Sequence, residues 1–210
     1  TKPTYLDLSY CESLQNVDGL TNCTKLDALD LSGCTSLQNL DGLANCTKLT
    51  VLNLDGCAAL QNLDGLANCT KLDYLKPLVE NDSTSRFQRI AALQNLDGLA
   101  NCTQLGELAL ADCAALQNVN GLANLTELTE LSLVGCSSLP TGLDSIPNLE
   151  SLDLSQFESL QNVDGLKTLT KLTRLDLSQC KSLQNVDGLA NLTKLYKLSL
   201  VGCTSLQNVD

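Results

Sequence analysis

The amino-acid sequence predicts an α/β solenoid, in which short strands and tight helical turns repeat along one axis. Two observations carry this prediction: a unit of 23 residues recurs, and each unit holds a short stretch whose leucines alternate with other residues. A unit of this size cannot bury its own apolar face, so neighbouring units must stack and share one core. We therefore expect residues 1–210 to form a single domain of about nine units. Successive units open at Leu14, Leu37, Leu60, Leu93, Leu116, Leu139, Leu160, Leu183 and Leu206.

Each unit divides into a strand and a turn. Leu29 and Leu31, for example, flank one intervening residue, which is the period-two pattern of a strand too short to be a helix. The segment DGLAN that follows, residues 41–45, has room for about one turn of 3₁₀ or α-helix. We expect Asp41 to cap the start of this turn, Asn45 to cap its end, and Gly42 to let the backbone bend.

The pattern L-x-x-L-x-L-x-x-C-x-x-L, seen from Leu26 to Leu37, resembles the leucine-rich repeat family over all nine units. The segment LDLSGC at residues 29–34 is similar to plant-receptor repeats, and LANLTKL at residues 189–195 is similar to bacterial surface-protein repeats. The resemblance implies a horseshoe or arc with a parallel β-sheet on the concave face and short 3₁₀ or helical turns on the convex face. It also implies a protein-binding role.

Two features interrupt this regularity. The chain starts inside a strand sequence, TKPTYLDLSYC, and stops at LQNVD within a unit, so we expect an uncapped fragment of a longer array. The interval from Leu60 to Leu93 is ten residues longer than the usual spacing. We assign the excess to a loop inserted at residues 76–91, because Pro77 replaces a strand leucine and ENDSTS has loop composition.

The 11 cysteines fall into two columns of the repeat. One column follows the strand and the other precedes the threonine of the N-C-T turn, and the equivalent positions in other units are apolar, as at Ile90, Leu125 and Phe157. We therefore expect free thiols that serve as small buried apolar side chains. A disulfide framework or a metal site is the weaker alternative, because no C-x-x-C motif or Cys/His cluster is present. Free thiols fit the cytoplasm or another reducing compartment.

Charge and composition argue against several functions. The formal net charge is −11, with 13 Lys and Arg residues and no His. Nucleic-acid binding is disfavoured because phosphate contacts need clustered basic residues, whereas a partner with a basic patch is favoured. We expect no enzyme, no catalytic residue, no cofactor and no metal, because His and the nucleotide-binding glycine motifs are missing. No apolar run reaches the roughly 18 residues of a membrane span, so we expect no membrane insertion.

The variable residues of the strands predict a binding surface. The leucines point inward, so the residues between them face outward and form columns across strands that lie about 4.8 Å apart. In the first units these columns combine acidic residues with tyrosine, a residue common at the centres of protein interfaces. The alternative is that the aspartates are only solvated strand residues. We predict contacts with a protein or peptide at Tyr5, Asp7, Tyr10, Asp30, Asn53, Asp55 and Tyr74 on the concave face.

The inserted loop is the second candidate. Phe87 lies between Arg86 and Arg89, and an aromatic residue beside arginines on a loop indicates an interaction element. The alternative is that Phe87 covers the defect left by Pro77. Two other functions remain open: a structural spacer, favoured by the similarity of the units, and an ice-binding or carbohydrate-binding surface, suggested by regular rows of threonine and asparagine.

Overall fold

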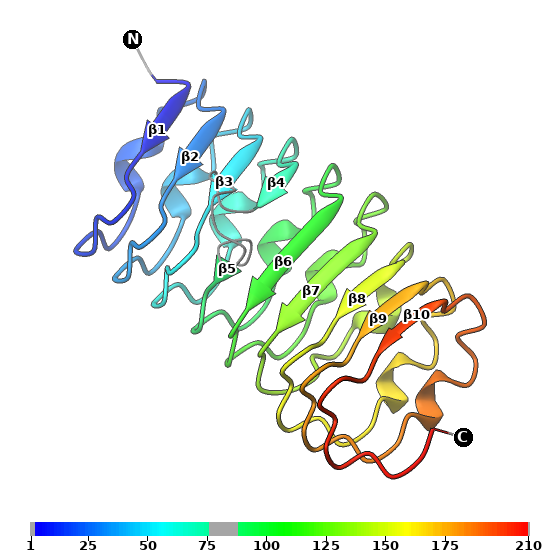
Figure 1. The fold of residues 1–210 in the computed structure, drawn as a ribbon. Coiled ribbons are helices and arrows are strands. Elements are labelled where there is room, and N and C mark those ends of the chain that lie inside the picture. Colours follow the sequence, from blue (N-terminus) through cyan, green and yellow to red (C-terminus); the bar gives the residue numbers. More distant parts are fainter. Residues whose placement is uncertain (1–2, 76–87, 210) are drawn as a thin grey trace.

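The computed structural model describes residues 3–75 and 88–209, which form one array of stacked units (Figure 1). The strands lie side by side on one face, the helical turns lie behind them, and the two ends of the chain lie at opposite ends of the array. The strands are β1 (Tyr5–Asp7), β2 (Ala28–Asp30), β3 (Val51–Asn53), β4 (Tyr74–Leu75), β5 (Gln88–Arg89), β6 (Glu107–Ala111), β7 (Glu130–Val134), β8 (Ser151–Asp153), β9 (Arg174–Asp176) and β10 (Lys197–Ser199).

In the part of the chain that the structure describes, the helices are all single 3₁₀ turns of three residues. Within the described ranges, none is long and apolar enough to cross a membrane. They are η1 (Asp18–Leu20), η2 (Asp41–Leu43), η3 (Asp64–Leu66), η4 (Asp97–Leu99), η5 (Asn120–Leu122), η6 (Leu143–Ser145), η7 (Asp164–Leu166) and η8 (Asp187–Leu189).

All strands pair in parallel in one open sheet. The order is β1-β2-β3-β4-β6-β7-β8-β9-β10, and β5 pairs with β6 beside this path. Equivalent residues of neighbouring units face each other, so that Ala28 pairs with Tyr5 on one side and with Val51 on the other. The predicted fold class, a solenoid with one parallel sheet and short 3₁₀ turns, is confirmed, and so is the predicted register of its columns.

The core is one continuous cluster between the sheet and the helices. The repeated leucines are fully buried, as at Leu29, Leu31 and Leu37. Burying a leucine side chain contributes about 1.5–3 kcal/mol, so stacking many units accumulates stability that one unit lacks. Ile90 and Phe157 stand in the cysteine column and are also fully buried, as the sequence predicts.

The asparagine before each DGL or NGL turn caps the helix, which corrects the role expected for the aspartate. Asp41 is the first helical residue, and the N-cap Leu40 makes no side-chain capping hydrogen bond. Instead, Asn39 Oδ1 accepts a hydrogen bond from the Asp41 N–H at 3.2 Å. Asn45, the expected C-cap, donates from Nδ2 to the Thr21 carbonyl of the preceding unit at 3.2 Å. The two asparagines therefore have separate tasks, one within the unit and one between units.

The glycine of a DGL turn that stacks on another such turn is needed for close approach rather than for bending, which is a second correction. A Cβ at Gly42 would lie 1.9 Å from the Val17 carbonyl oxygen, and one at Gly65 would lie 1.9 Å from that of Leu40. Neither glycine has a positive φ. Consecutive 3₁₀-helices thus pack main chain against main chain, and a side chain at this position would separate the units.

The sheet continues across the long unit through two separate short strands. β4 ends at Leu75, and the chain joins the sheet again as β5, where Arg89 pairs with Ala111 of β6. Residues 88–91, the last four of the expected insertion, therefore belong to the repeat itself. The predicted contact residues Arg86 and Phe87 lie outside the described residues.

Candidate protein-binding surface

An apolar and aromatic row runs across the first four strands. It consists of Tyr5, Ala28, Val51 and Tyr74, which pair in sequence from β1 to β4. Tyr5 is 56% exposed and Tyr74 is 45% exposed, while Ala28 and Val51 are half-buried between them. Three inter-strand steps of about 4.8 Å separate the tyrosines by roughly 14 Å. We call these four residues the tyrosine row.

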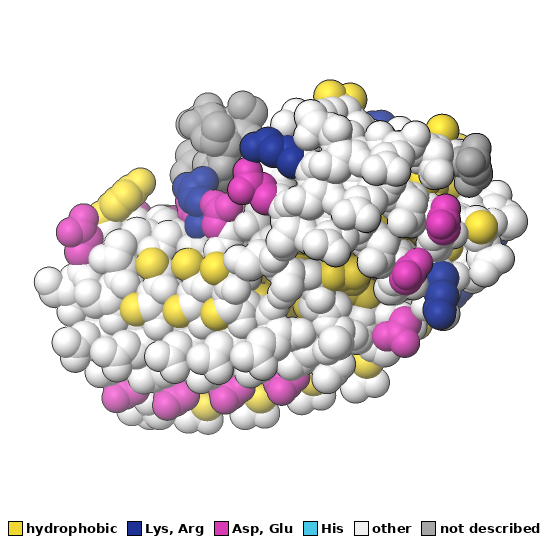
Figure 2. Space-filling view, turned by 90° about the horizontal axis from the view of Figure 1, so that it is seen from below, with side chains coloured by type: hydrophobic (Ala, Val, Ile, Leu, Met, Phe, Trp, Pro, Cys, Tyr) yellow, Lys and Arg dark blue, Asp and Glu magenta, His cyan; other side chains and the backbone are white. Residues whose placement is uncertain are grey.

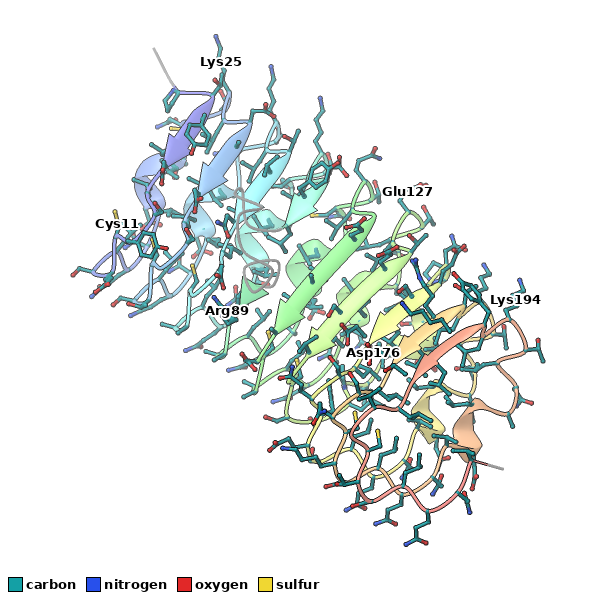
Figure 3. All side chains as sticks on the ribbon, viewed as in Figure 1. Cys11, Lys25, Arg89, Glu127, Asp176 and Lys194 are labelled. Atoms are coloured by element: carbon teal, nitrogen blue, oxygen red, sulfur yellow. The ribbon has the colours of Figure 1, made fainter. Side chains whose placement is uncertain are left out.

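Tyr10 extends this surface to the border where the strands end. It follows β1 in the left-handed region, with φ 58°, and is 76% exposed. Its ring lies over the next unit, since a Cβ at Gly33 would be 2.6 Å from Tyr10 Cδ1. Cys11 and Arg89 lie on this same border, whereas Lys25, Glu127 and Lys194 lie on the border where the strands begin (Figure 3). Tyr5, Tyr10 and Tyr74 therefore all belong to the part of the sheet formed by β1 to β4, at the N-terminal end of the array.

The column beside the tyrosine row consists of Asp7, Asp30 and Asn53. Their side chains accept hydrogen bonds from the turns that follow the strands. Asp7 Oδ1 accepts a hydrogen bond from the Ser9 N–H at 2.9 Å, and Asp30 Oδ1 accepts one from the Ser32 N–H at 2.8 Å. Asn53 Nδ2 also donates to Asp30 Oδ2 at 3.2 Å. Asp30 is 6% exposed and Asn53 is 3% exposed, so these two side chains support the surface from below.

Asp7 differs from Asp30 in its exposure. It lies at the open end of the column, and its carboxylate is accessible to solvent. The hydrogen bond from the Ser9 side chain, followed by that from the Ser9 N–H, lowers the pKa of Asp7. Asp7 is therefore charged at neutral pH and can meet a basic partner.

Asp55 is paired within the protein. Its Oδ2 accepts a hydrogen bond from Arg89 Nη2 at 2.9 Å, and its Oδ1 accepts one from the Arg89 N–H at 3.2 Å. The Asp55 side chain is 16% exposed and that of Arg89 is 45% exposed. This pair joins the turn after β3 to β5 across the interrupted unit, so Arg89 is placed by the sheet rather than by a projecting loop.

A second ion pair lies further along the strand face. Arg174 Nη2 of β9 lies 2.5 Å from Glu130 Oε1 of β7, spanning the intervening strand that carries Ser151. Sequence reasoning missed this pair, although opposite charges two units apart in one column were a usable signal.

Figure 2 views the molecule from another side, where acidic side chains recur along one border and a broad central area carries few charged groups.

Sequence reasoning also missed a column of left-handed residues directly after the strands. Four units place glycine there, and four other described units place a residue with a side chain, at a cost of roughly 1–2 kcal/mol each. The recurrence of glycine at one position of the repeat was the available signal. The glycines are Gly33, Gly56, Gly135 and Gly202, and the other residues are Tyr10, Asp112, Gln156 and Gln179.

The cysteines are free, and eight of them are buried. In the post-strand column, Cys57 Sγ donates to the Leu31 carbonyl of the preceding unit at 3.2 Å. Burial raises the pKa of Cys57 and of Cys69 to about 12. Such thiols remain protonated at neutral pH and are poor nucleophiles and metal ligands, because both roles need the thiolate. Cys11 is exposed, and Cys23 and Cys203 are half-buried.

Comparisons with known proteins agree with this architecture. Internalin C2 from Listeria monocytogenes is 23% identical, with 94% of this chain and 80% of that chain covered and a TM-score of 0.63. The leucine-rich repeat domain of the type III effector XopL is 22% identical over 93% and 76% of the two chains, with a TM-score of 0.54. Internalin F from Listeria monocytogenes is 19% identical over 93% and 70%, with a TM-score of 0.51. These likenesses show the fold.

Sequence relationships define the family. No curated protein matches the chain. The model for the BspA-type leucine-rich repeat region matches residues 7–76, 78–158 and 139–210. Leucine-rich repeat proteins are generally modules for protein binding rather than enzymes. Because the match spans most of the sequence, the chain belongs to the BspA-type leucine-rich repeat family.

Proposed function

We propose that this protein is a non-catalytic interaction module that binds a protein or peptide through the N-terminal part of its strand face. The observation that carries the proposal is the gathering of Tyr5, Tyr10 and Tyr74, three of the four tyrosines, on β1 to β4 and the adjoining turn. Tyrosine supplies a large contact area at a low entropy cost, and it is enriched where binding energy concentrates.

The scaffold keeps these rings available. The strands beneath the tyrosine row are held by parallel pairing, and their leucines are committed to the core. The buried side chains of Asp30 and Asn53 fix the adjoining turns. A partner therefore meets a surface that is already ordered, which lowers the entropy cost of binding.

The preferred partner is a segment with apolar residues and a basic patch. The apolar part would contact the tyrosine row, and the basic part would lie toward the exposed Asp7. The net charge of −11 favours such a partner at long range and repels acidic ones. The same charge disfavours nucleic acid, and we keep a reducing compartment as the proposed location because of the free, buried thiols.

The test is capture of partners from host lysate by the whole chain, quantified by mass spectrometry. We expect a Tyr5→Ser/Tyr74→Ser double variant to lose a captured protein at least about tenfold, because removal of one interface hot spot costs about 2 kcal/mol or more. Circular dichroism should be unchanged, since both side chains are exposed. Asp7→Asn should reduce capture more at low salt than at high salt.

Tyr196→Ser is the matched control. Tyr196 is 75% exposed but precedes β10 at the other end of the sheet, so its loss should leave capture intact. Equal recovery by the wild type and the double variant would contradict the proposed surface. If no protein is captured specifically, the structural spacer becomes the better interpretation. Phe87→Ser in the same assay tests the predicted contribution of the inserted segment.

A further inference from the structure

A groove lies beside the C-terminal ends of β6 to β9, away from the tyrosine row. Its volume is about 560 Å³, and the turns of four successive units line it. Its walls include three of the left-handed residues that carry a side chain, Asp112, Gln156 and Gln179. Ser137, Glu158 and Lys181 are also among the lining residues.

Other residues in the column of left-handed positions show that these side chains are not needed to form the turn. Gly33, Gly56 and Gly202 form the same turn without one. Among the described residues, a left-handed residue with a side chain occurs at this position only at Tyr10, in the proposed protein-binding surface, and at the three residues of the groove. Backbone strain kept in this way is typical of functional positions. The side chains of Asp112, Gln156 and Gln179 are therefore candidates for a role in binding.

Two of these side chains extend along the axis of the solenoid. A Cβ at Gly135 would lie 2.5 Å from Asp112 Oδ1, and a Cβ at Gly202 would lie 2.4 Å from Gln179 Nε2. Each side chain thus reaches over the glycine of the following unit, and that glycine leaves the space for it. The polar groups form a line along the groove instead of converging on one point, which suits a chain-like ligand.

The chemistry of the lining selects for hydroxyl groups. Asp112 offers acceptor oxygens, while the glutamine amides and the Ser137 hydroxyl offer both donors and acceptors. Lys181 lies 2.9 Å from Glu158, so the one cation of the groove is already paired, which disfavours a phosphate ligand. The lining contains no aromatic, leucine, isoleucine or valine residue, which disfavours an apolar ligand.

We propose that this groove binds a neutral, β-linked oligosaccharide. Equivalent positions in successive units are about 4.8 Å apart, close to the length of one sugar ring in an extended β-linked chain. Each unit can then present its polar side chain to one sugar. In an extended peptide, side chains on one face recur every two residues, about 6.6 Å, and this spacing does not match the spacing of the units.

The experiment is a titration of the isotope-labelled full chain with cellohexaose, followed by nuclear magnetic resonance. We expect shifts of the side-chain amide signals of Gln156 and Gln179 and of the Gly135 backbone amide. Maltohexaose, which has the same sugar in a coiled α-linkage, should shift them less. The variant Gln156→Gly/Gln179→Gly should weaken cellohexaose binding at least about tenfold. It should stay folded, because glycine already occupies this position in other units.

Tyr10→Gly is the matched control, since it makes the same change in the same turn outside the groove. It should alter cellohexaose affinity less than about twofold. Absence of groove shifts at millimolar cellohexaose would overturn the proposal, as would shifts that the double variant leaves unchanged. Binding of a Ser- and Gln-rich decapeptide at these signals, with no response to cellohexaose, would assign the groove to peptides and also overturn it.

Discussion

The regular 23-residue units and the shortened unit that opens at Leu139, which is two residues shorter, pack their helices in different ways. In the regular units a glycine lies against the main chain of the preceding helix, as Gly65 does against Leu40. In the shortened unit, η6 has the sequence LDS, and the next glycine, Gly165, faces only the Leu139 side chain, with its Cβ position 3.1 Å from Cδ2. The comparison teaches that the glycine is required by the neighbouring unit rather than by its own helix.

The largest expected effect is the difference in stability lost when each of these two glycines is replaced by alanine. Gly65→Ala should destabilise the protein by about 3 kcal/mol, because its methyl group would overlap a carbonyl that cannot move without parting two units. Gly165→Ala should change stability by less than about 1 kcal/mol, since a leucine side chain can rotate away. Urea denaturation of both variants measures this. Equal losses would show that the glycine serves its own helix after all.

Alkaline pH should reduce stability through units with a buried cysteine in the N-C-T turn, but not through units with leucine at that position. The pKa of Cys69 is raised by burial to about 12, above its unfolded value of about 8.5. The unfolded state therefore loses the thiol proton first, so the stability that this thiol contributes is complete below about pH 8.5 and is lost as pH rises toward 12. The loss is at most about 1.4 kcal/mol per pH unit for each such thiol.

Cys69→Leu provides the comparison, because Leu125 occupies the equivalent position. The variant should lose less stability than the wild type between pH 8 and pH 10, when both are measured by urea midpoint. An identical pH dependence of the two proteins would exclude titration of Cys69 as a cause.

Thiol labelling should sort the cysteines by their place in the array. Cys11 should react first in the folded protein, Cys23 and Cys203 more slowly, and the eight buried thiols only after local or global unfolding. Alkylation followed by mass spectrometry gives the order. Rapid reaction of seven or more thiols in the folded state would contradict the buried columns.

The smallest expected effect concerns the left-handed turns. Gln156→Gly should relieve roughly 1–2 kcal/mol of strain but lose about 0.5–1 kcal/mol through the greater freedom of the unfolded chain. We expect a net stabilisation of at most about 1 kcal/mol, measured by thermal unfolding. The reverse change, Gly56→Gln, should destabilise by a similar amount. A loss of stability in Gln156→Gly would show that this side chain supports the fold.

The fold was predictable because its signal is repeated. Alternating leucines such as Leu29 and Leu31 fix which side chains face the core, and the constant spacing fixes which residues pair across strands. The same logic placed Phe157 in the core, because it stands in a column of small apolar side chains. Repetition turned weak local preferences into a reliable arrangement.

The details of the site were less predictable because they depend on contacts between particular units. The pairing of Asp55 with Arg89 needs the sheet to close over the interrupted unit, which spacing alone does not reveal. The low exposure of Asp30 depends on the amide that Asn53 supplies from the next strand. The gathering of Tyr5 and Tyr74 followed directly from the register and was anticipated.

The side-chain hydrogen bonds between units have a direction that matters while the chain is being made. Asn45 donates to Thr21, Cys57 donates to Leu31, and Asn101 donates to Ala67, so each donor reaches back to an earlier residue. A chain that emerges from the ribosome N-terminus first has already formed the carbonyl that each new donor needs. For these side-chain bonds, growth in this direction leaves acceptor oxygens at the unfinished end, and water satisfies these readily, although strand N–H groups such as that of Leu31 still await the next unit. The solenoid is therefore suited to being added one unit at a time during translation.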